Sequence, residues 1–124
     1  MNKIQRMSDS ERTVMEVIWK LGKPLTTADL RNESKHLAAW KLSTLLTFLT
    51  RLEQKGLLDV EKNGKMNIYH FLVTKEEYIQ FETNTFLANV HQGSVKSLIS
   101  ALCSDSTDLD AKELRKLKRW LDEL

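Results

Sequence analysis

Cysteine, proline and long apolar runs are scarce in this sequence of 124 residues. Cys103 is the only cysteine, which excludes an intrachain disulfide and a thiolate cluster that could hold structural zinc. The three histidines lie far apart in the sequence, so we expect no metal site and no other cofactor. No apolar run reaches the roughly 18 residues that span a bilayer, and residues 1–12 lack a hydrophobic signal core. We therefore expect a cytoplasmic protein without membrane insertion.

Catalytic motifs are also missing. The sequence contains no Gly-rich phosphate loop, no convincing pair of acid and base, and no nucleophile motif. A chain of this length forms one ordinary domain, or a small domain with an oligomerisation arm, and leaves no room for a second large catalytic domain. We expect a protein that is not an enzyme.

Charge is small in total but unevenly distributed. The formal net charge is +2, yet residues 1–75 hold 13 Lys and Arg against 8 Asp and Glu, whereas residues 76–124 hold 6 against 9. A basic front half and an acidic rear half predict one module that faces a polyanion and a second module with another role.

The front half has the pattern of three helices. Ser8 and Glu11 form a capping box at the start of the first helix, which Gly22 ends. Thr26 or Thr27 can cap a second helix to about residue 35, with residues 36–41 as a connection. A third helix is expected from Ser43 to Lys55, because leucines recur there at helical spacing.

A β-hairpin is predicted next. Gly56 suits the left-handed end of the third helix, and residues 57–62 and 66–73 are rich in residues that tolerate strands. Asn63 and Gly64 lie between the two strands, where both tolerate the positive φ of a tight turn.

Three helices followed by a hairpin is the order of a winged helix-turn-helix. The major groove of DNA is about 12 Å wide and admits one helix, which makes the helix at residues 43–55 the candidate for reading DNA. The face opposite its leucines carries short hydroxyls and one cation, which suit contacts to phosphates and base edges. These residues are Ser43, Thr44, Thr47, Thr50 and Arg51.

The hairpin is the candidate wing, over residues 60–70. Lys62, Asn63 and Lys65 surround its turn, where two cations can reach the DNA backbone or the minor groove. An ordinary solvated hairpin with surface lysines is the alternative interpretation. Trp40, just before the third helix, is interpreted as a residue that sets this helix and can also meet the DNA backbone.

The rear half is predicted to be a set of short amphipathic helices that begins at Thr74, which can form a capping box with Glu77. Their apolar stripes cannot be buried well within about 50 residues, so pairing with a second copy is expected. The overall fold class is mainly α with a small β-hairpin wing, divided into a DNA-binding domain (1–73) and a helical dimerisation domain (74–124). The predicted dimerisation residues are Tyr78, Phe81, Phe86, Leu87, Val90, Val95, Leu98, Ile99, Leu102, Leu114, Leu117 and Leu121.

The chain resembles the penicillinase-repressor family, which comprises repressors of β-lactamase and methicillin-resistance operons and related copper-responsive repressors. The resemblance covers nearly the whole chain. It rests on four segments in the same order and spacing: SDSERTVMEVIWK, AWKLSTLLTFLTRLEQKGLL, NGKMNIYHF and FLANVHQGSVKSLISAL.

The resemblance implies a homodimeric repressor that binds a palindromic operator. It also implies a further partner, because family members of the β-lactam type are cleaved in the rear helices when a membrane metalloprotease sensor is triggered. DNA contacts carried over by position fall on Trp40, Lys41, Ser43, Thr44, Thr47, Arg51 and Lys65, and Tyr69 matches the wing's aromatic residue.

Three features depart from the family pattern. Residues 41–43 are Lys-Leu-Ser where Ser-Pro-Lys is common, and Leu46 replaces a polar residue such as Gln, although Leu46 could contact a thymine methyl group. The aligned cleavage pair is Ala101 and Leu102 instead of Asn-Phe. The cysteine-rich end of the copper-responsive branch is missing, which argues against copper sensing by that route.

A winged-helix module that binds another protein is the alternative function. In that interpretation Leu46 docks an apolar partner and the fold has no sequence-specific contact with DNA.

Overall fold

The computed structural model describes residues 4–104 and 111–123. The chain divides into two compact units, Met1–Tyr78 and Ile79–Leu124. Within the described ranges, no helix is both long enough and apolar enough to cross a bilayer.

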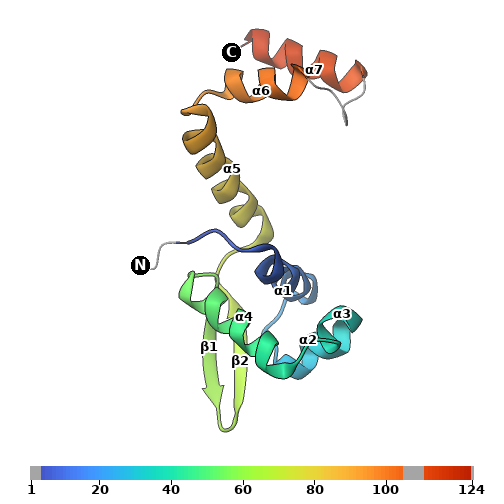
Figure 1. The fold of residues 1–124 in the computed structure, drawn as a ribbon, viewed down its shortest axis with the longest axis vertical. Helices are drawn as coiled ribbons and strands as arrows, with labels where there is room; N and C mark the ends of the chain where they lie inside the picture. The colour runs from blue at the N-terminus through green and yellow to red at the C-terminus, as the bar shows by residue number, and fades with distance from the viewer. Residues whose placement is uncertain (1–3, 105–110, 124) are drawn as a thin grey trace. The chain divides into compact units, whose positions relative to one another are not determined.

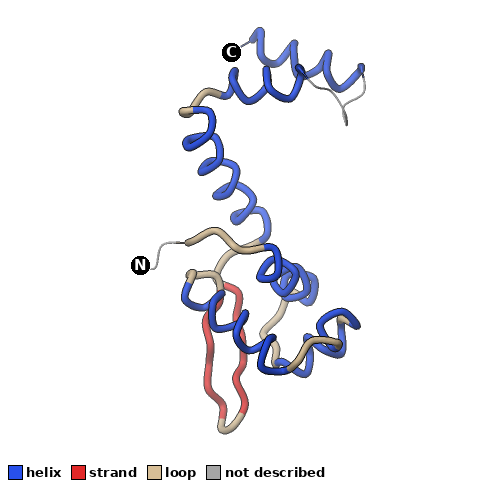
Figure 2. Tube along the Cα trace, viewed as in Figure 1, coloured by secondary structure: helices blue, strands red, loops and turns tan. Residues whose placement is uncertain are grey.

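The first unit contains four helices followed by a two-stranded antiparallel sheet, as Figures 1 and 2 show. The predicted fold class, mainly α with a β-hairpin, is confirmed. The elements are α1 (Asp9–Leu21), α2 (Thr27–Glu33), α3 (Lys35–Ala38), α4 (Leu42–Gln54), β1 (Leu58–Asn63) and β2 (Met66–Phe71).

The predicted capping box at α1 is confirmed. The Ser8 backbone N–H donates to the Glu11 carboxylate at 2.8 Å, and the Glu11 N–H donates to the Ser8 hydroxyl at 3.2 Å. Gly22 ends the helix in the left-handed conformation, with φ at +65°. The same reciprocal bonds join Thr26 and Asp29 at the start of α2.

The second predicted helix is broken in two. Ser34 has extended backbone angles that end α2, and its hydroxyl accepts a hydrogen bond from the Leu37 N–H at 3.2 Å. This cap starts α3, so the prediction of a connecting segment from residue 36 to 41 is wrong for residues 36–38, and residues 39–41 alone connect α3 to α4. A serine whose side chain caps the next helix also disfavours continuation of the helix before it.

The helix α4 is anchored by one face. Leu45, Leu49 and Leu52 are fully buried there. At its end, the N–H of Gly56 donates to the carbonyl of Glu53 and the next N–H donates to that of Leu52. With Gly56 at a φ of +80°, these two bonds form the expected left-handed end of the helix.

The hairpin turn differs from the prediction by one residue. Asn63 pairs with Met66 as the last rung of the ladder, so the two loop residues are Gly64 and Lys65. Only Gly64 of these has positive φ, at +65°, which is the requirement at the first loop position of a type II′ turn. Asn63 therefore belongs to β1, and the prediction that it lies in the turn between the strands is wrong.

Leu25 extends the sheet by one residue. Its N–H donates to the Tyr69 carbonyl at 3.1 Å, and the Tyr69 N–H donates back at 2.8 Å. Both side chains are buried. This bridge fixes the hairpin to the segment between α1 and α2, and so fixes the base of the wing.

The helix α5 (Lys75–His91) begins in the first unit, where Thr74 and Glu77 cap it reciprocally as predicted. The second unit holds the rest of α5, together with α6 (Val95–Ser104) and α7 (Ala111–Glu123), and these last two helices pack against each other. Gln92 and Gly93, both with positive φ, form the turn between α5 and α6.

Candidate nucleic-acid interface

The face of α4 opposite its buried leucines is open to solvent. Arg51 and Leu46 are exposed on it, and Thr44 is half-buried at its N-terminal end. The other exposed residues of this face are Ser43, Thr47 and Thr50. A shallow hollow lies along the same face, lined by Leu46, Thr47, Thr50, Arg51 and Gln54. The sequence-predicted residues of this helix therefore share one accessible surface.

The N-terminus of α4 is set by an aromatic cluster. The Trp40 ring lies 5.4 Å from Phe48 and 5.6 Å from His36, measured between centroids. Arg31 holds the preceding turn, because its Nη2 donates to the carbonyls of Ala38 (3.2 Å) and Trp40 (3.0 Å). Trp40 is half-buried and packs as a helix-setting residue, as the sequence interpretation expects.

Lys41 is the first residue before α4, and no side chain of the described residues caps this helix end. Unpaired amides at a helix N-terminus, together with the helix dipole, favour a phosphate. Exposed Lys41 lies at this end and adds a positive charge. The start of α4 is thus suited to contact the DNA backbone.

The hydroxyls of Thr47 and Thr50 on α4 are already used as donors. Thr47 Oγ1 donates to the Ser43 carbonyl at 2.9 Å, and Thr50 Oγ1 donates to the Leu46 carbonyl at 3.0 Å. Each hydroxyl can still accept a hydrogen bond, but its proton is not available to a base. The two threonines therefore present acceptors and methyl groups.

Arg51 is the cation in the second half of the outward face. Its guanidinium carbon lies 5.6 Å from the centroid of the Phe48 ring, which restrains the side chain. Among the described residues, no carboxylate forms an ion pair with it. Arg51 keeps its charge and its fork of donors for a phosphate or a guanine.

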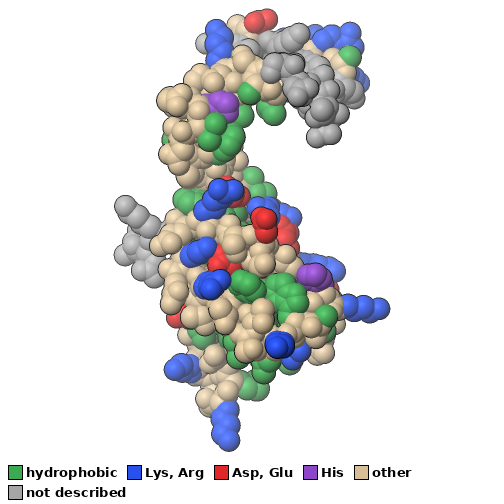
Figure 3. Space-filling view, in the orientation of Figure 1, with side chains coloured by type: hydrophobic (Ala, Val, Ile, Leu, Met, Phe, Trp, Pro, Cys, Tyr) green, Lys and Arg blue, Asp and Glu red, His purple; other side chains and the backbone are tan. Residues whose placement is uncertain are grey.

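The wing presents the predicted cations to solvent. Lys62, Asn63 and Lys65 are all exposed, and Figure 3 shows Lys and Arg side chains projecting at the tip of the hairpin. Tyr69, in contrast, is buried at the base. The tip can thus reach an anion while the base remains part of the core.

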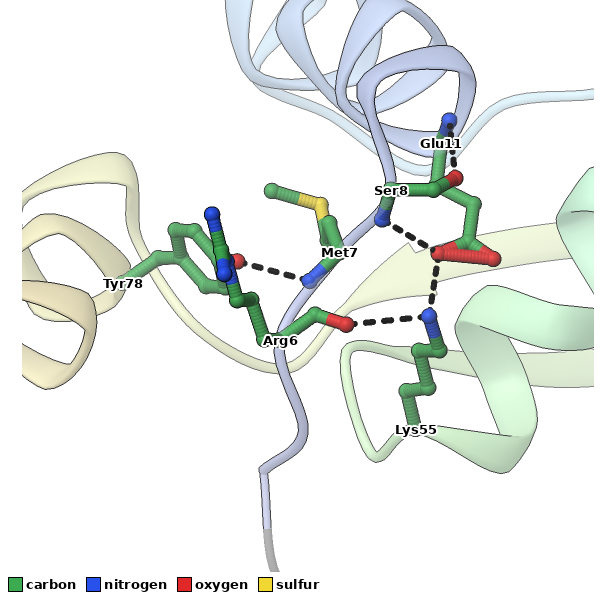
Figure 4. A network of polar contacts seen from close by, with 6 residues as sticks. All are labelled: Arg6, Met7, Ser8, Glu11, Lys55 and Tyr78. Atoms are coloured by element: carbon green, nitrogen blue, oxygen red, sulfur yellow. Dashed lines mark hydrogen bonds and ion pairs between the residues drawn. The ribbon is translucent and has the colours of Figure 1, made fainter. Parts of the chain in front are cut away.

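The C-terminal end of α4 is fixed by a network that sequence reasoning missed (Figure 4). The Lys55 ammonium donates to the buried Glu11 carboxylate and, at 2.9 Å, to the Arg6 carbonyl. The Met7 N–H donates to the Tyr78 hydroxyl at 2.8 Å. Local spacing predicts the cap that Glu11 forms, but no local pattern indicates a partner 44 residues away.

The pKa of Glu11 reflects this network. Burial by itself would raise it, but the hydrogen bond from Lys55, the bond from the Ser8 backbone and the Lys55 charge lower it below 4.5. A lowered pKa means that the ionised form stabilises the fold above about pH 4.5. This contribution is lost as the pH falls through the pKa of the folded state.

We expect Glu11→Gln to destabilise the first unit at pH 7 by about 1–3 kcal/mol, because the Lys55 ammonium and the Ser8 N–H lose the charged carboxylate to which they donate. The penalty should shrink at a second pH well below 4.5, because the wild-type carboxylate is progressively neutralised as the pH falls through its lowered folded-state pKa. Urea unfolding at the two pH values measures this difference. Glu53→Gln, at an exposed position on α4, is the matched control and should have little effect. An equal penalty at both pH values would contradict the assignment.

The predicted dimerisation residues fall into distinct groups. Tyr78 is fully buried in the first unit, so its side chain is not free to meet a second copy, and Ile99 is buried in the second unit. The side chains of Leu114, Leu117 and Leu121 lie outside the described residues. Half-buried positions are Phe81, Leu87, Val95 and Leu98, and exposed positions are Phe86, Val90 and Leu102.

The residues predicted for cleavage are accessible. Ala101 and Leu102 are exposed, and both lie within the last turns of α6.

Comparison with known proteins identifies relatives over the full chain. The penicillinase repressor of Bacillus licheniformis is 30% identical over 123 residues, covering 99% of this chain and 94% of that protein. The methicillin resistance regulatory protein MecI of Staphylococcus aureus is also 30% identical over 123 residues, covering 98% of each chain.

The structural comparison matches the first unit. The solution structure of the DNA-binding domain of the repressor BlaI aligns with a TM-score of 0.53 and 35% identity, covering 63% of this chain and 94% of that domain. The model of the penicillinase repressor family matches residues 7–123. These matches confirm the resemblance inferred from the four sequence segments: the chain belongs to the penicillinase repressor family.

Proposed function

We propose that this protein is a transcriptional repressor that binds a palindromic operator as a homodimer, through α4 and the wing. The observation that carries the proposal is the outward face of α4, with Arg51 exposed and unpaired by any carboxylate of the described residues. Support comes from the 35% identity of this unit to the DNA-binding domain of the repressor BlaI.

In this proposal α4 lies in the major groove. Trp40, Lys41, Ser43 and Thr44 meet the backbone and base edges at its start, and Leu46, Thr47 and Arg51 follow along the groove. Lys62, Asn63 and Lys65 extend the contact through the wing. Contacts of this kind release counterions, so the affinity depends steeply on salt.

Two copies are required by the proposed two-fold site. Ile79, Phe86 and Val90 are exposed large apolar residues at positions i, i+7 and i+11 of α5, which places them on one helix face. A second copy of the chain would cover this stripe. Its two-fold symmetry would place the half-sites about one helical turn of DNA apart.

The test is binding of the purified protein to a promoter fragment of its own operon at several salt concentrations. Arg51→Ala should weaken binding and reduce the slope of log affinity against log salt by about one for each phosphate that Arg51 neutralises. Lys96→Ala removes an exposed cation of α6 and is the matched control, which should keep the wild-type slope. An affinity for the promoter that never exceeds that for random DNA would refute the repressor function.

A protein-binding module is the competing function, favoured by exposed Leu46. The charge reversal Arg51→Glu separates the two. Because it places an anion on the proposed DNA face, it should abolish promoter binding by a repressor. Unchanged promoter binding would favour the protein-binding module.

Inactivation by a sensor-linked protease is the last part of the proposal. Cleavage of the bond between Ala101 and Leu102 is supported by the exposure of both residues. Both lie in α6, so the last turns of the helix would have to open before a protease could bind the segment in an extended form.

A further inference from the structure

Two leucines of α4 stand out by their exposure: Leu42 lies at the exposed start of the buried leucine stripe, and Leu46 borders the outward hollow. Leu42 is 46% exposed and Leu46 is 37% exposed, one helical turn apart, whereas Leu45, Leu49 and Leu52 are completely buried. A helix at a protein surface normally turns polar residues to solvent. Two neighbouring large apolar side chains open to solvent indicate a surface that contacts apolar groups.

The two threonines beside Leu46 offer no free hydroxyl proton. Thr47 and Thr50 line the shallow hollow and donate their hydroxyl protons to carbonyls of the helix itself. The side-chain donors of the hollow, Arg51 and Gln54, come five and eight residues after Leu46. Reading a purine through its hydrogen-bonding edge needs donors such as Arg, Asn or Gln. The middle of α4 is therefore better suited to van der Waals contact than to hydrogen-bonded readout.

The charge around the leucines favours DNA over an apolar protein partner. Exposed Lys41 precedes Leu42, and exposed Arg51 lines the hollow beside Leu46. Two cations at the ends of an apolar stripe match a surface where phosphates flank an apolar group. In the major groove that apolar group is the 5-methyl of thymine, which no other DNA base carries.

We propose that Leu46, with Leu42 beside it, determines operator specificity by packing against thymine methyl groups in the major groove. This inference rests on the proposed repressor function and specifies which chemical group of the operator α4 reads. Burying one methyl group contributes about fourfold in affinity, and two symmetric half-sites contribute about 15-fold.

The experiment uses one promoter fragment of the protein's own operon in two forms. The first form contains thymine, and in the second form deoxyuridine replaces the thymine nucleotides. Deoxyuridine keeps Watson–Crick pairing and lacks only the methyl group. The wild-type protein should bind the uracil form about 15-fold more weakly. Leu46→Ala should bind the thymine form more weakly than the wild-type protein does. Its affinity for the uracil form should be almost the same as its affinity for the thymine form. Leu46 is exposed, so circular dichroism should show the variant folded.

Leu72→Ala is the matched control, because Leu72 is an exposed leucine of the same unit outside α4 and the wing. It should retain the full difference between the two DNA forms. Equal wild-type affinity for both forms would overturn the inference while leaving the repressor function intact, as would a full uracil effect in Leu46→Ala. Failure of the wild-type protein to prefer the thymine promoter over random DNA would instead overturn the repressor function and this inference with it.

Discussion

Val90→Asp is expected to dissociate the proposed homodimer and to weaken promoter binding by on the order of 100-fold. Val90 is 52% exposed on the same face of α5 as Phe86 and Ile79. In a dimer that covers this stripe, the new carboxylate would be buried without a partner, which costs several kcal/mol. A monomer forfeits the gain from binding two half-sites at once, hence the large effect on affinity.

Sedimentation at micromolar concentration and promoter binding measure the two consequences of Val90→Asp. Asn89→Asp is the matched control, because it introduces the same carboxylate at the neighbouring exposed position, turned about 100° away around the helix. It should remain dimeric and keep its affinity. A Val90→Asp protein that stays dimeric would show that this stripe is not where the two copies meet.

Leu49→Ala is expected to have the largest effect on stability. Leu49 is fully buried in the middle of α4, between Leu45 and Leu52. Removing a buried leucine side chain costs about 2–5 kcal/mol, from the reduced burial and from the cavity that remains. A domain of this size loses about 4–8 °C of melting temperature per kcal/mol, so the first unit should melt at least about 8 °C lower.

Leu46→Ala is the control for Leu49→Ala, since the same atoms are removed from an exposed position on the same helix. Its melting temperature should change by only a few degrees. Thermal unfolding followed by circular dichroism measures both variants. Equal destabilisation by the two substitutions would contradict the assignment of Leu49 to the core and Leu46 to the outward face.

Short-range patterns predict much of the first unit correctly. The caps at Ser8 and Thr74 involve residues three positions apart, and the end of α4 at Gly56 depends on the few residues around it. Such interactions form within one segment, so residue types at a fixed spacing are enough to predict them.

Short-range reasoning fails where two local options compete. Ser34 could lie inside a longer helix or cap a new one, and the structure has the cap. Asn63 could lie in the turn or end the strand, and pairing with Met66 puts it in the strand. The ladder register decides the second case, because moving a strand by one residue turns every side chain to the other face.

Apart from the short helix α3, the order of helices and hairpin follows from the sequence alone, as do the buried leucines of α4 and the face that carries Arg51, because helical and strand periodicities are local properties. Three other features depend on the tertiary structure: Lys55 reaches Glu11, Leu25 fixes the wing at Tyr69, and Leu42 and Leu46 stay exposed beside each other. The first two join residues 44 positions apart in the sequence, and exposure depends on every element packed around a side chain. Long-range packing therefore positions the outward face of α4, whereas local periodicity only selects the helix that carries it.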